Sequence, residues 1–144
     1  MQPDDIDWKI IEILRENFIP NNAIARELGV SEGMIRQRVK RLKEAGILKI
    51  KALINPDVLE NLQLAMVAIN ITESALLKKR ADQIASLENV LSVSFTSGRY
   101  DLFAEVLVTS NRDLVRFLTE ELPNVEGVTN TETFMMLRSY GKFV

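Results

Sequence analysis

The chain has 144 residues, of which 47% are hydrophobic and 26% charged, a composition typical of one ordinary folded domain or two small ones. It contains neither Cys nor His, which excludes disulfides, thiolate ligands and every catalytic or metal-binding role of histidine. The N-terminus is acidic and no apolar run approaches the ~18 residues of a membrane span, so we expect no secretion signal, no membrane insertion and a cytoplasmic location.

Two helices are predicted at the start of the chain. The first begins at Asp4, whose side chain is suited to cap a helix, and ends near Asn17. Its apolar residues follow at helical spacing: Ile6, Ile10, Ile13 and Leu14. The second runs from about Asn22 to Leu28, and Gly29 supplies the left-handed conformation with which many helices end.

A third helix is predicted from the Ser31 cap to about Ala45, with Ile35, Val39 and Leu42 facing the core. Two short helices that meet at a glycine, the second one basic, are typical of a helix-turn-helix that enters DNA. The charge is local: residues 1–52 have a net charge of +2 and residues 53–144 of −4, which together give the −2 of the whole chain. We therefore expect a phosphate-binding face in the first part only.

The exposed side of this third helix carries side chains suited to DNA. Arg36 can bond a guanine edge and Gln37 an adenine edge. Lys40 and Arg41 can reach phosphates, and the helix N-terminus at Ser31 can receive one. The alternative is an ordinary solvated charged face, and Arg38, at the edge of the apolar stripe, is expected to pair with an acid of its own domain instead. The candidate DNA-binding residues are Ser31, Gly33, Arg36, Gln37, Lys40, Arg41, Lys49 and Lys51.

Residues 47–54 alternate in a β-like pattern and end at Asn55-Pro56, which predicts the strand or hairpin of a wing. Lys49 and Lys51 lie on it, where they would touch the DNA backbone or remain ordinary solvated lysines. The expected organisation is a winged helix-turn-helix over 1–52, a linker over 53–62 and a second domain over 63–144.

The second domain alternates strand and helix signals in the order β-α-β-β-α-β. Strands are expected near 65–71, 91–96, 102–108 and 128–137, with helices that start at Ser74 and at Ser110 or Asn111. This is the ferredoxin-like arrangement, with two helices on one face of a four-stranded antiparallel sheet. The fold class is therefore α+β. The uncovered sheet face predicts a partner, most simply a second copy of the chain.

Several short motifs follow one another along the chain: Ile6-Asp7-Trp8-Lys9-Ile10-Ile11, Leu28-Gly29-Val30-Ser31, Arg38-Val39-Lys40-Arg41-Leu42, Gly46-Ile47-Leu48, Asn55-Pro56, Ser97-Gly98-Arg99-Tyr100-Asp101-Leu102, Leu122-Pro123-Asn124-Val125 and Val128-Thr129-Asn130-Thr131-Glu132-Thr133. In this order and at these spacings, they resemble the Lrp/AsnC (feast/famine) family of transcriptional regulators over essentially the whole chain. The chain departs from the family at Pro20, where a capping Ser or Thr is common. It also has Gly33 in the first turn of the recognition helix, where Gly costs up to about 1 kcal/mol relative to Ala.

The resemblance implies a DNA-binding regulator that dimerises through its second domain, often assembles dimers into rings such as octamers, and senses a small metabolite, usually an amino acid, between subunits. An architectural protein that wraps DNA with little ligand dependence is the alternative. A third possibility is an enzyme similar to the sirohaem decarboxylases, whose tetrapyrrole chemistry relies on His. The chain has no His, which argues against this possibility. We expect no enzymatic activity, no cofactor and no metal.

The turn Ser97–Asp101 is the best candidate for an effector site. Gly98 and nearby amides would bind the carboxylate of an amino acid, and Asp101 its ammonium group. The alternative is a hairpin turn whose Asp satisfies local amides. The last strand is polar on both faces, which suggests a wet cleft or a sheet edge. The candidate effector residues are Ser97, Gly98, Arg99, Tyr100, Asp101, Thr131, Glu132 and Thr133.

Overall fold

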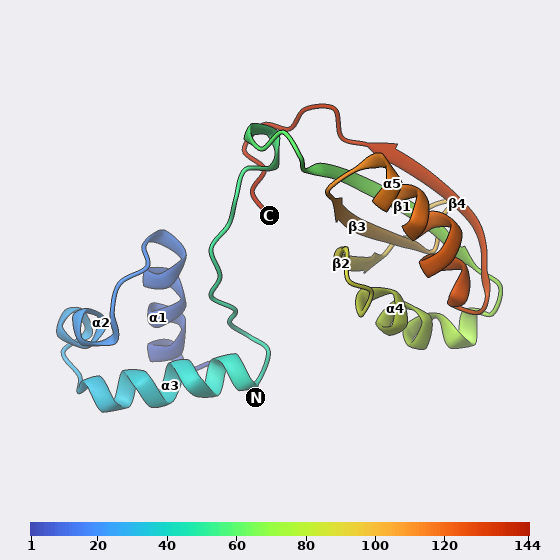
Figure 1. Ribbon diagram of the computed structural model, residues 1–144. Coiled ribbons are helices and arrows are strands. Elements are labelled where there is room, and N and C mark those ends of the chain that lie inside the picture. Colours follow the sequence, from blue (N-terminus) through green and yellow to red (C-terminus); the bar gives the residue numbers. More distant parts are fainter. The chain divides into compact units, whose positions relative to one another are not determined.

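The computed structural model describes residues 1–144 as two compact units, Met1–Ala52 and Leu53–Val144, here called the helical unit and the sheet unit (Figure 1). The helical unit contains α1 (Asp5–Glu16), α2 (Asn21–Leu28) and α3 (Glu32–Glu44). None of the helices in either unit is both long enough and apolar enough to cross a membrane.

The ends of these helices follow from local capping. The Asp4 carboxylate accepts the Asp7 amide at 2.9 Å and the Asp7 carboxylate accepts the Asp4 amide at 3.1 Å, a reciprocal capping box. Ser31 Oγ accepts the Met34 amide at 3.2 Å, as expected of the cap of α3. Gly29 closes α2 at φ 68°, and the helix starts directly after Pro20 without a side-chain cap.

Apolar side chains of all three helices meet in one core. Ile10, Ile24 and Ile35 are completely buried there, with Ala25 beside them. They confirm the apolar stripes expected from the helical spacing. A three-helix core of this size places α3 firmly with one face inward, which leaves its other face for function.

The segment after α3 corrects one prediction. Residues 47–54 were expected to form the strand or hairpin of a wing, but no strand lies between α3 and the 3₁₀ turn Pro56–Val58. A single strand needs a partner to satisfy its backbone groups, and the helical unit contains no other strand. Ile54 instead exchanges two backbone hydrogen bonds with Val144, at 2.8 and 2.9 Å, within the sheet unit.

The sheet unit has the order β1, α4, β2, β3, α5, β4. Its elements are β1 (Gln63–Ile71), α4 (Leu77–Ala85), β2 (Val90–Phe95), β3 (Leu102–Val108), α5 (Asn111–Arg116) and β4 (Val128–Met135). The strands form one antiparallel sheet in the order β2-β3-β1-β4, which confirms the predicted α+β fold and the β-α-β-β-α-β order. Ser110 caps α5 as expected. Ser74 does not cap α4, because a 3₁₀ turn over Ser74–Leu76 precedes that helix.

Both helices cover the same face of the sheet (Figure 1). Every second residue of β3 on that face, from Leu102 to Val108, is completely buried, together with Ile84 of α4 and Phe117 after α5. No helix covers the other face, here called the open face. The register places these residues of the central strands on it: Leu64, Met66, Ala68, Phe103, Glu105 and Leu107.

Candidate functional site

The outer face of α3 carries most of the predicted DNA-binding residues. Ile35 and Leu42 are completely buried, so the opposite side of the helix faces solvent. The exposed residues there are Ser31, Gly33, Arg36, Gln37, Lys40 and Arg41. A side chain at Gly33 would meet no atom within 4 Å, so this position is open to an approaching surface. Lys49 and Lys51 are also exposed, but in the segment without regular structure that follows α3.

Two of these cations already have acidic partners on α3. Arg36 Nη2 lies 2.6 Å from Glu32 Oε1, and Lys40 Nζ lies 3.8 Å from Glu44 Oε1. All four side chains are largely exposed, and ion pairs of this kind stabilise a helix by only about 0.3–0.5 kcal/mol. A phosphate or a base edge can therefore replace these acids at little cost.

Arg38 and Arg41 point instead toward α1, where they bind two acids. Arg38 Nη1 lies 2.6 Å from Asp4 and 2.8 Å from Asp7, so the expectation that Arg38 pairs with an acid of its own domain agrees with the structure. Arg41 Nη2 lies 2.7 Å from Asp7, which is completely buried. The sequence predicts only a phosphate contact for Arg41, because Asp7 is 34 positions away and its bond to Arg41 leaves no local signal.

The predicted effector turn is tied to the sheet by Asp101. Its Oδ2 accepts the Ile71 amide at 2.8 Å, and its own amide donates to the Ile69 carbonyl at 3.1 Å. A carboxylate occupied in this way holds the turn against β1. The reading in which Asp101 satisfies local amides therefore describes this structure, and its expected bond to a ligand ammonium group would have to compete with the Ile71 amide.

A second anionic group lies next to the turn. The Tyr100 hydroxyl donates to Glu132 of β4, and this bond to a carboxylate raises the pKa of Tyr100, with burial as a further cause. The Tyr100 ring also meets Phe103 edge-on, and Phe103 stacks on Phe134. These aromatic rings and the Glu132 carboxylate form one cluster on the open face, here called the Tyr100 cluster.

The eight predicted effector residues do not share one surface. Glu132 pairs with Ala68 on the open face, whereas Thr131 and Thr133 pair with Ile69 and Val67 on the face that the helices cover. Side chains of neighbouring strand residues point to opposite faces, so the two threonines cannot join the Tyr100 cluster. The exposed residues Ser97, Gly98 and Arg99 form the turn beside it.

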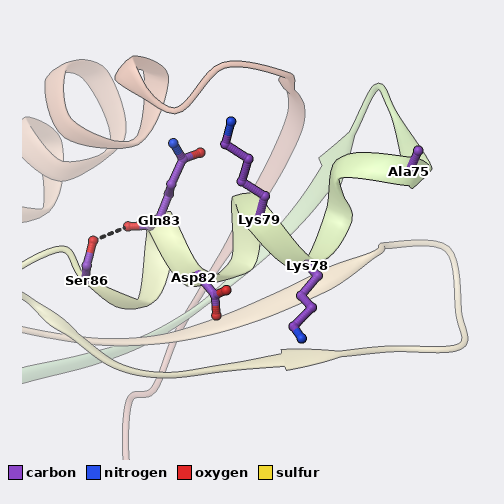
Figure 2. A pocket seen from close by; sticks show the side chains of 6 residues that line it. All are labelled: Ala75, Lys78, Lys79, Asp82, Gln83 and Ser86. Atoms are coloured by element: carbon purple, nitrogen blue, oxygen red, sulfur yellow. Dashed lines mark hydrogen bonds between the residues drawn. The ribbon is translucent and has the colours of Figure 1, made fainter.

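A shallow hollow runs along α4 but brings no functional groups together. Its lining comes from one short segment of chain, Ala75 to Ser86 (Figure 2). Lys78 and Lys79 extend to different sides of the helix, so their ammonium groups cannot bind one anion together. Arg80, between Lys79 and Ala81, is buried and bonds to Glu126 at 2.9 Å, which makes it part of the fold.

Comparison with known proteins identifies both units. Residues 64–142 match the model of the Lrp/AsnC ligand binding domain, and residues 3–49 match a winged helix-turn-helix DNA-binding domain. The HTH-type transcriptional regulator FL11 of Pyrococcus furiosus is 32% identical over 94% of this chain and 89% of its own length. These matches define a DNA-binding transcriptional regulator with a ligand-binding domain, a class that is not enzymatic. The chain belongs to the Lrp/AsnC family.

Solved structures agree with this assignment. The leucine response regulatory protein LrpA of Mycobacterium tuberculosis is 25% identical and superposes with a TM-score of 0.82, over 97% of this chain and 96% of its own. A transcriptional regulator of Neisseria meningitidis, solved in complex with L-Met, has the same fold at 22% identity, with a TM-score of 0.72 over 98% and 94% of the two chains.

The Asp4–Arg38 bond predicts how the helical unit responds to acid. The Arg38 guanidinium, with help from the Asp7 amide, holds the pKa of Asp4 below its ordinary value of 3.8. A lowered pKa in the folded state stabilises the fold above that ordinary value, and this contribution is lost as the pH falls through the lowered pKa. We expect Asp4→Asn to lower the melting temperature at neutral pH, with the difference from the unmodified protein shrinking as the pH falls toward 3.

The control is Asp5→Asn, which removes a neighbouring exposed carboxylate that does not bond to Arg38. Equal melting temperatures for Asp4→Asn and the unmodified protein at neutral pH would contradict the prediction. Circular dichroism at the helical wavelength suits the measurement, because three helices make up the helical unit.

Proposed function

We propose that α3 is the recognition helix and that its exposed face reads double-stranded DNA. The observation that carries the proposal is the gathering of Arg36, Gln37 and Lys40 on the solvent side of a helix within the segment that matches a winged helix-turn-helix. Arg36 and Gln37 are assigned to base edges, and Lys40 and Arg41, with the amides at Ser31, to phosphates. Lys49 and Lys51 are assigned to the flanking backbone. Because the target is DNA, the protein acts inside the cell, and we assign it to the cytoplasm.

Arg36→Ala with Lys40→Ala tests the recognition helix. The Arg36 base contact is expected to contribute about 1–3 kcal/mol of discrimination, and loss of the Lys40 phosphate contact reduces the salt slope by about one. Affinity for the DNA upstream of the protein's own gene, measured by fluorescence anisotropy at several salt concentrations, should therefore fall markedly.

The matched control removes the same charge from the sheet unit. Lys78→Ala with Lys79→Ala deletes two exposed cations of α4 and should leave binding close to that of the unmodified protein. If both double variants weaken binding equally, only net charge matters and α3 is not the recognition helix.

We propose further that the open face of the sheet is covered by a second copy of this chain. Met66, Phe103 and Leu107 are only partly buried on this face, and Phe134 beside them is 42% exposed. An apolar hollow of about 270 Å³ lies on this face, lined in part by Met66 and Met136. Two identical faces that meet about a twofold axis would bury these side chains, as in most homodimers. Assembly of such dimers into an octamer or a similar ring follows the family pattern.

Met66→Arg tests this face, because two cations would meet across the dimer axis in a desolvated surface. Light scattering after gel filtration should give a dimer or a larger assembly for the unmodified protein and a mass near the 16.3 kDa monomer for the variant. Val115→Arg, on an exposed apolar side chain of α5, is the control and should keep the assembly. A variant mass equal to that of the unmodified protein would rule out this face as the interface.

The effector proposed for the sheet unit is an amino acid, bound at the turn Ser97–Asp101 and the adjoining part of β4. The match to a ligand binding domain and the name of the leucine response regulatory protein support this class of ligand. The structure modifies the assignment of groups. Glu132, which makes a single side-chain bond to Tyr100, is a better acceptor for an ammonium group than Asp101, while Arg99 and the turn amides suit a carboxylate. Thr131 and Thr133 lie on the face that the helices cover and are left out of this site.

A thermal-shift screen of the common amino acids tests the effector. A ligand at a hundredfold excess over its Kd stabilises the folded protein by about 2.7 kcal/mol, which is a clear rise in melting temperature. Glu132→Gln should abolish the rise, whereas Glu120→Gln, which removes a charge from an exposed position elsewhere in the unit, should keep it. If no amino acid stabilises the protein, the architectural DNA-wrapping function is favoured instead.

A further inference from the structure

The buried carboxylate of Asp7 links α1 to the DNA-facing side of α3. Its Oδ1 accepts from Arg38 at 2.8 Å, and its Oδ2 accepts from Arg41 at 2.7 Å and from the Asp4 amide at 3.1 Å. The side chain of Asp7 has no exposed area. A carboxylate without access to water is stable in its charged form only if such donors hold it in place.

The two arginines that share this carboxylate differ in exposure. The Arg38 side chain is 19% exposed and also bonds to Asp4, so it completes the contact between α1 and α3. The Arg41 side chain is 48% exposed and its guanidinium makes this one bond, through Nη2. A guanidinium has five N–H donors in one plane. When Asp7 anchors one edge of that plane, the remaining donors are held at the surface of α3.

We infer that Asp7 is a positioning residue for DNA binding: it orients the Arg41 guanidinium toward a DNA phosphate and so couples α1 to the recognition surface. The inference rests on the proposed contact of Arg41 with DNA. The benefit is entropic, because a flexible arginine would have to be ordered on binding and an anchored one is ordered beforehand. The Asp7 carboxylate itself repels phosphate, so net charge alone predicts the opposite effect of its removal.

Asp7→Asn distinguishes the two explanations, because they predict opposite changes in DNA affinity. Full-length protein is titrated with sheared, mixed-sequence double-stranded DNA, because a phosphate contact acts on every sequence alike. Loss of one phosphate contact costs about eightfold in affinity near ~0.1 M salt and lowers the salt slope by about one. We expect Asp7→Asn to approach this loss although it makes the protein more positive. Binding equal to or tighter than that of the unmodified protein, in a folded variant, would overturn the inference.

Asp4→Asn is the matched control, since it removes the same charge from the same cluster but leaves the bond between Asp7 and Arg41 in place. It should reduce stability and leave DNA affinity unchanged or slightly higher. A loss equal to that of Asp7→Asn would show that the cluster acts only through the fold, and would overturn the positioning role.

A double-mutant cycle with Arg41→Ala separates the positioning role of Asp7 from the DNA contact of Arg41. In the Arg41→Ala background, Asp7→Asn should cause no additional loss, because the group that it positions is absent. Independent, additive losses would overturn the positioning role while preserving the Arg41 contact. If Arg41→Ala alone leaves binding unchanged, the DNA contact itself is wrong.

A measurement on the unmodified chain covers the case in which Asp7→Asn does not fold. Nitrogen NMR of the arginine side chains reports how fast each guanidinium rotates. Arg41 should rotate slowly with and without DNA, and Arg15, which is exposed and makes no side-chain bond, should rotate fast. Equal, fast rotation of both would show that Asp7 does not hold Arg41.

Discussion

The two central strands of the sheet impose the main constraint on this protein, because both of them carry apolar residues on both faces. In β1, Val67 and Ala68 are neighbours in sequence, point to opposite faces and are both completely buried. The helices α4 and α5 can cover only one of these faces. The sheet unit therefore has a closed hydrophobic core on one side of the sheet and no helical cover on the other. The proposed dimer is the direct consequence of this asymmetry, since the open face resembles half of a core.

In the helical unit, the constraint is electrostatic. The cations of α3 are largely balanced by acids of the unit itself, through Glu32, Glu44, Asp4 and Asp7. The net charge of +2 over residues 1–52 therefore does not show that the individual cations of α3 differ in how firmly their acidic partners hold them. Arg36 and Lys40, whose acidic partners are exposed, are free to exchange partners. Arg38 and Arg41 are held by the buried Asp7 and are not. In the proposed DNA complex, the first kind leaves its acidic partner to contact bases and phosphates, whereas Arg41 of the second kind contacts phosphate in a fixed orientation.

Features with a local cause could be predicted from the sequence. The caps at Asp4, Ser31 and Ser110, the glycine end of α2 and the alternation of β3 all depend on residues close together in the chain. What could not be predicted depends on partners far away. The wing strand failed because strand patterning does not guarantee a neighbouring strand, and the roles of Asp7 and Asp101 depend on backbone and side-chain groups some 30 positions away. The candidate effector residues share one turn and one strand, but the sequence could not reveal which faces of the sheet they would occupy.

The pairing of Ile54 with Val144 joins the two ends of the sheet unit. The chain from β4 onward is fastened at its end to the start of the segment that leads into β1, and Ser139 is held on the way by Asp57 at 2.6 Å. Residues 54–57 are therefore held in place by the tail that follows β4. A chain that ended before Ser139 would lose both of these contacts, so the end of the sequence stabilises the segment that leads into β1.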